Sequence, residues 1–249
     1  MNTALSKPID RTADGQTGLW IVGVFSLAMA WVEAAAVFYL RTVVDRVEPY
    51  QPHPLPDMGR WNEAELVREA ATMVMLLAVG WLAGRTWRSR FGYACVAFGV
   101  WDLAYYAFLK ILTGWPHSVL DWDILFLIPL PWWGPVLAPA LIALLLLVGG
   151  ALLGLGDRPE RPLWPGRLSA WAGGVGVLLA LGVFMADAAR ALPDGEAAIR
   201  NVLPVRFPWP LFLLAWVLMA APVADLAAQV VRWRRGDFER SWAGPAPTP

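Results

Sequence analysis

The chain has 249 residues, of which 58% are hydrophobic and 16% are charged, with a net charge of zero and a mean hydropathy of +0.50. Soluble domains average about 45–50% apolar and about 25% charged residues, so this composition indicates an integral membrane protein. It gives no support to nucleic-acid binding, because no basic run is interleaved with aromatic residues.

Six stretches are long enough to cross about 30 Å of hydrocarbon, which takes about 20 helical residues. We therefore predict an all-α fold, a polytopic transmembrane helical bundle that forms one domain over residues 19–231. Residues 1–18 precede it as a cytoplasmic segment, and residues 232–249 follow as a cytoplasmic basic segment with a Pro-rich tail that is expected to be disordered. The predicted spans are residues 19–40, 62–84, 91–112, 135–155, 168–187 and 208–231.

The basic residues predict the orientation of these spans. With the N-terminus in the cytoplasm, the inner segments contain twelve Lys and Arg residues and the outer segments contain eight. The short inner loops are also the more densely basic ones. We therefore expect a multi-pass protein of the cell (inner) membrane with both termini in the cytoplasm.

The segment between the third and fourth spans, residues 121–134, reads DWDILFLIPLPWWG. Its apolar part is too short to cross a bilayer, and Pro129 and Pro131 prevent a continuous helix. One interpretation is a Pro-broken half-helix that enters from the outer face and lines a cavity, where irregular backbone is tolerated. The other is a hydrophobic helix that rests in the outer headgroups and is anchored by its Trp residues.

Three acidic residues lie inside predicted spans, where an ionisable group is costly and is usually retained for function. Glu33 follows Trp20 by thirteen residues, and at 1.5 Å per residue it lies about 20 Å above the inner interface. The same reckoning places Glu69 and Asp102 about 18 Å above that interface. The three carboxylates are therefore predicted to form one layer in the outer half of the membrane.

Asp102 is followed at i+4 and i+8 by Tyr106 and Lys110, which predicts a polar stripe on one face of the third span. If these faces turn inward, they form an outward-facing cavity. A structural alternative is that the acids pair with Arg68 or Lys110 of neighbouring helices and only fix their register. The predicted binding residues are Glu33, Glu69, Asp102, Tyr106, Lys110 and His117.

A divalent metal is a second possibility, because the outer loop brings together nitrogen and oxygen donors in His117, Asp121 and Asp123. The alternative is that His117 is an ordinary interfacial residue. A b-type haem held by two intramembrane histidines is excluded, since His53 and His117 are the only histidines and both lie in predicted loops. No other cofactor is indicated.

Three functions fit these observations. The first is the handling of an ion, a proton or a small molecule at the intramembrane carboxylates. The second is a membrane-embedded enzyme that acts on a lipid or quinone-like substrate. The third is an accessory subunit of a membrane complex, with the bilayer and another membrane protein as its partners. Small residues at i, i+4 spacing predict close helix packing, either within the bundle or against such a partner: Gly150 and Gly154, and Ala172, Gly176 and Ala180.

Overall fold

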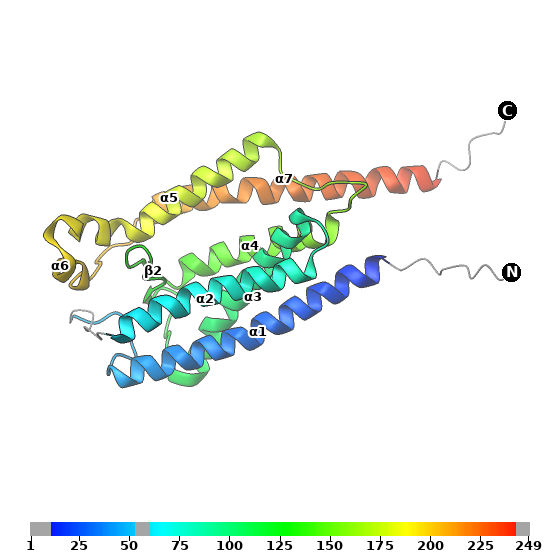
Figure 1. The fold of residues 1–249 in the computed structure, drawn as a ribbon. Coiled ribbons are helices and arrows are strands. Elements are labelled where there is room, and N and C mark those ends of the chain that lie inside the picture. The colour runs from blue at the N-terminus through cyan, green and yellow to red at the C-terminus, as the bar shows by residue number, and fades with distance from the viewer. Residues whose placement is uncertain (1–10, 53–59, 243–249) are drawn as a thin grey trace, which may run out of the picture.

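The computed structural model describes residues 11–52 and 60–242, which form an elongated bundle of long helices with a small β-hairpin (Figure 1). Within these residues, six helices are long and apolar enough to cross a membrane, which confirms the predicted polytopic bundle. A 3₁₀ turn, η1 (Leu192–Asp194), and a short helix, α6 (Glu196–Arg200), lie between the fifth and sixth spans. The six long helices are α1 (Arg11–Val43), α2 (Arg60–Ala83), α3 (Trp87–Thr113), α4 (Leu137–Gly156), α5 (Arg167–Ala191) and α7 (Trp209–Trp242).

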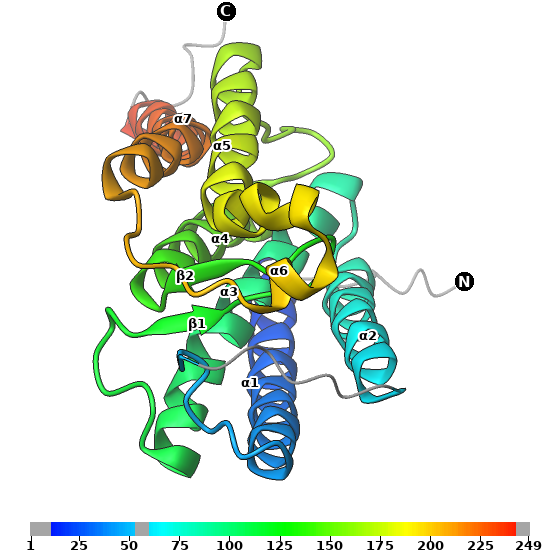
Figure 2. The same ribbon diagram turned by 90° about the vertical axis from the view of Figure 1, so that its left-hand side faces the viewer.

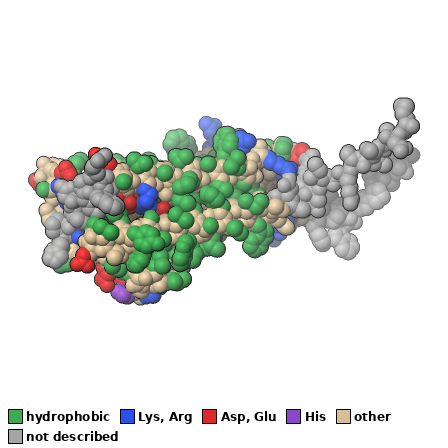
Figure 3. Space-filling model, turned by 60° about the horizontal axis from the view of Figure 1, so that its bottom comes forward, with side chains coloured by type: hydrophobic (Ala, Val, Ile, Leu, Met, Phe, Trp, Pro, Cys, Tyr) green, Lys and Arg blue, Asp and Glu red, His purple; other side chains and the backbone are tan. Residues whose placement is uncertain are grey.

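The outward surface of these helices is strongly apolar. The exposed fractions of Trp20 on α1, Leu82 on α2 and Leu168 on α5 are 76%, 84% and 86%. Apolar surface on this scale is unfavourable in water but matches the hydrocarbon of a bilayer. Figure 3 shows hydrophobic side chains along the length of the bundle. The chain is therefore an integral membrane protein.

Helix α3 lies at the centre of one half of the bundle, where it packs against α1, α2 and α4 (Figure 2). It begins at a capping box in which the side chains of Thr86 and Ser89 satisfy free backbone N–H groups. The buried Asp157, just after α4, accepts hydrogen bonds from the Thr86 hydroxyl, from Arg88 Nε at 2.7 Å and from Leu163 N at 2.8 Å. These bonds join the start of α3 to the loop between α4 and α5.

The small residues serve the internal bundle. A Cβ atom placed on Gly150 of α4 would lie 2.5 Å from the carbonyl oxygen of Gly92 on α3. On α5, a Cβ atom at Gly176 would lie 2.6 Å from the carbonyl oxygen of Ala215 on α7. Both glycines therefore allow two backbones to approach closely, as the first of the two alternatives predicted.

Residues 121–134 do not form the predicted half-helix, and they do not form a surface helix either. They form an antiparallel hairpin of two short strands, β1 (Trp122–Ile124) and β2 (Trp133–Pro135), in which Asp123 lies opposite Gly134. Its hydrogen bonds continue inward from Leu125 N to the Trp132 carbonyl. The prolines at the tip cannot donate backbone hydrogen bonds, and a tight loop between paired strands needs fewer donors than a helix.

The first and last helices of the chain, α1 and α7, extend beyond the predicted spans. Helix α1 begins at Arg11, and α7 continues to Trp242, so part of each predicted flanking segment is helical. The remaining parts of those segments, residues 1–10 and 243–249, lie outside the described residues. The start of α1 and the end of α7 lie at the same end of the bundle, and the hairpin lies toward the other (Figure 1). We call the latter the hairpin end.

Candidate functional site

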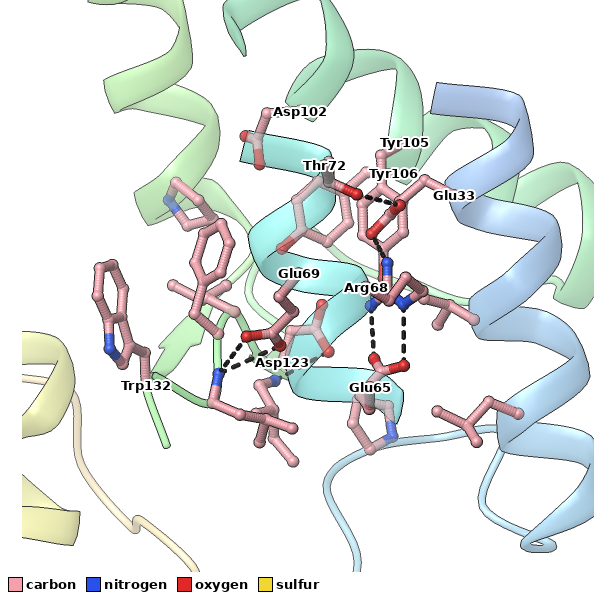
Figure 4. A pocket seen from close by; sticks show the side chains of 18 of the residues that line it. Glu33, Glu65, Arg68, Glu69, Thr72, Asp102, Tyr105, Tyr106, Asp123 and Trp132 are labelled. Carbon is pink, nitrogen blue, oxygen red and sulfur yellow. Dashed lines mark hydrogen bonds and ion pairs between the residues drawn. The ribbon is translucent and has the colours of Figure 1, made fainter. Parts of the chain in front are cut away.

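A cavity of about 250 Å³ lies toward the hairpin end, bounded by α1, α2, α3 and the hairpin, with further walls from α4 and α5 (Figure 4). Its polar lining comes from elements that are far apart in the sequence. The three acids predicted to share one layer all line it, although they come from three different helices. The predicted binding residues that line the cavity are Glu33, Glu69, Asp102 and Tyr106.

One face of α2 supplies much of this polar lining. Glu65, Arg68, Glu69 and Thr72 are spaced at i, i+3, i+4 and i+7, which places them on one side of a helix. The Arg68 guanidinium forms ion pairs with Glu65 on its own helix and with Glu33 on α1. The Thr72 hydroxyl donates to the other oxygen of Glu33 at 3.1 Å. The predicted pairing of Glu33 with Arg68 is therefore present, and it lies in the cavity wall.

A second ion pair joins α1 to the hairpin. Arg41 Nη2 lies 2.7 Å from Asp123 Oδ1, and the side chain of Asp123 is only 1% exposed. The guanidinium of Arg41 also lies over the ring of Trp115, with its carbon 4.7 Å from the ring centroid. Burial raises the pKa of the Asp123 carboxyl above its ordinary value, and the positive charge of Arg41 opposes that rise. Asp123 thus fastens the hairpin to the end of α1.

The tip of the hairpin is held by Glu69. The backbone N–H of Leu127 donates to both carboxylate oxygens of Glu69, at 3.2 and 3.1 Å. Figure 4 shows Glu69 pointing from α2 toward this part of the hairpin. The irregular backbone of the tip therefore finds an acceptor inside the bundle, as backbone away from water requires.

Asp102 differs from the other acids because it has an unsatisfied oxygen. Asp102 is only 7% exposed, and its Oδ2 atom is buried with no hydrogen-bond partner in the described part of the chain. It lies at the top of the view in Figure 4, at the side of the cavity away from Glu65. The indole N–H groups of two further lining residues, Trp101 and Trp132, are also buried without an acceptor there. The cavity therefore contains polar groups that the chain itself does not satisfy.

Two predicted binding residues lie elsewhere. Lys110 is exposed and its Nζ donates to the carbonyl of Gly114 at 2.6 Å, so it completes the C-terminal end of α3. At 100° per residue, a residue eight positions after Asp102 is rotated by about 80° from it, which explains why the stripe leaves the cavity. His117 is exposed as well, and its Nε2 lies 3.1 Å from Glu48 Oε1.

The structure does not bring the proposed metal ligands together. Asp123 points into the bundle toward Arg41, whereas Asp121 accepts hydrogen bonds from the backbone N–H groups of His117 and Ser118. Within residues 11–52 and 60–242, no group of three or more His, Cys, Asp or Glu side chains is arranged to hold a metal ion. The second histidine of the sequence, His53, lies outside the described residues.

Sequence reasoning missed several cavity residues. Glu65 and Thr72 could have been found from their spacing to Arg68 on α2, because the four polar residues share one face. Arg41, near the end of α1, also lines the cavity and pairs with Asp123. The contact of the hairpin tip with Glu69 had no signal in the sequence, because it is made by the backbone N–H group of Leu127.

The charges of the cavity are unevenly matched. Its lining contains five acidic residues and three arginines. Arg68 is paired with Glu33 and Glu65, and Arg41 is paired with Asp123. Glu69 and Asp102 have no Lys or Arg partner among the described ion pairs, so neither carboxyl group is matched by a paired positive charge. Chemically, it is suited to accept hydrogen bonds, a proton or a positive charge.

Comparison of the chain with protein-family models, with curated proteins and with solved structures finds no match.

Proposed function

We propose that this integral membrane protein handles an ion, a proton or a small molecule, which it binds in the cavity at Asp102 and Glu69. The observation that carries the proposal is the buried, unpartnered Oδ2 atom of Asp102. A buried polar atom without a partner costs about 1–3 kcal/mol, and more when it carries charge. A ligand that donates to this oxygen removes that cost, which supports Asp102 as a binding residue and not only a structural one.

This proposal requires that small molecules can enter the cavity. An apolar carbodiimide can test that access. Dicyclohexylcarbodiimide reacts with carboxyl groups in apolar surroundings, and mass spectrometry of peptides locates the adduct. We expect modification of Asp102 or Glu69 in the folded protein. Asp102→Asn should fold normally, because the amide has the same shape and removes an unpaired charge, and it should lose the adduct at that position.

The matched control is Asp194→Asn, which makes the same change at an exposed residue of η1. This variant should be modified at the cavity as the unaltered protein is. If the folded protein carries no adduct at Asp102 or Glu69, small molecules do not reach the cavity and the proposed function is wrong.

We also propose that the hairpin end faces the outside of the cell (inner) membrane, with both termini in the cytoplasm and the bilayer around the bundle. The support is the excess of basic residues at the other end. In a Cys95→Ser background, His117→Cys should react with a membrane-impermeant maleimide on intact cells. Arg158→Cys, in the exposed loop after α4, should react only after the membrane is opened. The reverse labelling pattern would show the opposite orientation.

A further inference from the structure

The unmatched charge of the cavity restricts the chemistry of its ligand. Arg41 and Arg68 are already bound to carboxylates, and Arg46 donates to the carbonyl of Pro49 at 3.1 Å. An anionic ligand would compete with these existing acceptors. Asp102 and Glu69, in contrast, are carboxylates without a basic partner among the described ion pairs. Burying an unpaired carboxylate costs more free energy than burying an unpaired, neutral indole N–H group. The positive or hydrogen-bond-donating end of the ligand therefore contributes most to its binding.

The walls on either side of these carboxylates are aromatic. On α3, the rings of Trp101 and Tyr105 are stacked with their centroids 6.1 Å apart. On the other side, Trp132 of the hairpin is stacked on Phe184 of α5, with an angle of 5° between the rings and 6.3 Å between the centroids. All four residues line the cavity. Aromatic faces beside carboxylates are the surroundings in which proteins bind organic cations.

The same surroundings suit a bare metal ion poorly. Hard cations take six or more oxygen ligands, and the described part of the chain has no cluster of acidic, His or Cys side chains arranged for one. The size of the cavity is a second restriction. Its volume of about 250 Å³ lies below the range of about 300–1,000 Å³ that is typical for drug-sized ligands. The ligand is therefore a small molecule with an apolar part that contacts the rings.

We infer that the cavity binds a protonated organic amine with a short apolar chain or ring, its ammonium group at Asp102 and Glu69 and its apolar part between the two aromatic walls. This inference rests on the proposed function, because it names the ligand class of the same site. The ammonium donates to Asp102 Oδ2, which otherwise has no partner in the described part of the chain, and its charge offsets one of the two carboxylates that the arginines leave unmatched.

Three probes of equal chain length separate charge from apolar contact: n-octylamine, n-octanol and n-octanoate. They are added to the purified full-length protein in a maltoside detergent, and the Tm is followed by Trp fluorescence. We expect octylamine to raise the Tm in a saturable manner, by about 3–5 °C at ten times its Kd. Octanol and octanoate should raise it by less than a third of that amount.

Asp102→Asn and Glu69→Gln should each lose most of the octylamine response, whereas Asp194→Asn should keep it. If a variant is too unstable to measure, N,N-dimethyloctylamine should instead protect the unaltered protein from the carbodiimide at Asp102 and Glu69. This protonated tertiary amine keeps one N–H donor but cannot form an amide with an activated carboxyl. Equal responses to octanol or octanoate would overturn the amine assignment, and so would an octylamine response that both cavity variants retain. In either case, the proposed function still stands if the carbodiimide modifies Asp102 or Glu69 in the folded protein. If it modifies neither, both the amine assignment and the proposed function are wrong.

Discussion

Replacing Arg68 with Met is expected to lower the free energy of unfolding by about 3 kcal/mol, the lower end of the range for removing one partner of a buried ion pair. The side chain of Arg68 is 25% exposed, and those of its partners Glu33 and Glu65 are 8% and 14% exposed. Without the guanidinium, two buried carboxylates are left beside each other with no positive charge between them. Unfolding in mixed detergent micelles, followed by Trp fluorescence, measures the loss.

The control for this variant is Arg190→Met on α5. Arg190 also pairs with an acid one turn away, Asp187, but its side chain is 72% exposed. Exposed pairs contribute about 0–1 kcal/mol, so this substitution should change stability little. Adding Glu33→Gln and Glu65→Gln to Arg68→Met should restore most of the loss, because the orphaned charges are then gone. Equal losses for the two single variants would show that the Arg68 pairs do not hold α1 to α2.

The helical part of the fold could be predicted because a bilayer imposes a strong rule. Backbone groups in hydrocarbon must be satisfied within the segment, so every apolar stretch of about 20 residues must be a helix. The ends of the helices do not follow that rule. Arg11 and Trp242 lie well beyond the apolar stretches, where water also satisfies the backbone and hydropathy no longer marks an end.

The cavity could be predicted only in part, for a related reason. Helix rise fixes the depth of a residue, so a common depth for Glu33, Glu69 and Asp102 follows from counting. Which side of a helix faces inward depends on its rotation, which the even hydrophobicity of these spans leaves open. Lys110 was misplaced because, eight residues after Asp102, it is rotated by about 80° around the helix from that residue. The hairpin was missed because strands of three residues are too short to show an alternating pattern.

The contact between α3 and α4 gives the second large expected effect. Gly150→Ala should lower the free energy of unfolding by about 2 kcal/mol. The added Cβ atom would lie 2.5 Å from the carbonyl oxygen of Gly92 and 2.8 Å from the backbone nitrogen of Val96. Both are backbone atoms, which cannot turn aside as a flexible side chain can, so the two helices must separate. The loss should exceed the gain of about 1 kcal/mol that Ala brings over Gly in a helix.

Gly174→Ala provides the matched control, because it makes the same change in a spanning helix at an exposed position. Apart from its chain neighbours and the nearby backbone of α5, no atom lies within 4 Å of a Cβ atom placed on Gly174. This variant should therefore be neutral or more stable by up to about 1 kcal/mol. Helix α3 also carries Asp102 and Tyr106, so a shift of α3 should weaken octylamine binding in Gly150→Ala and leave it unchanged in Gly174→Ala. Equal stability of the two variants would mean that α3 and α4 are not in the close contact on which the position of Asp102 depends.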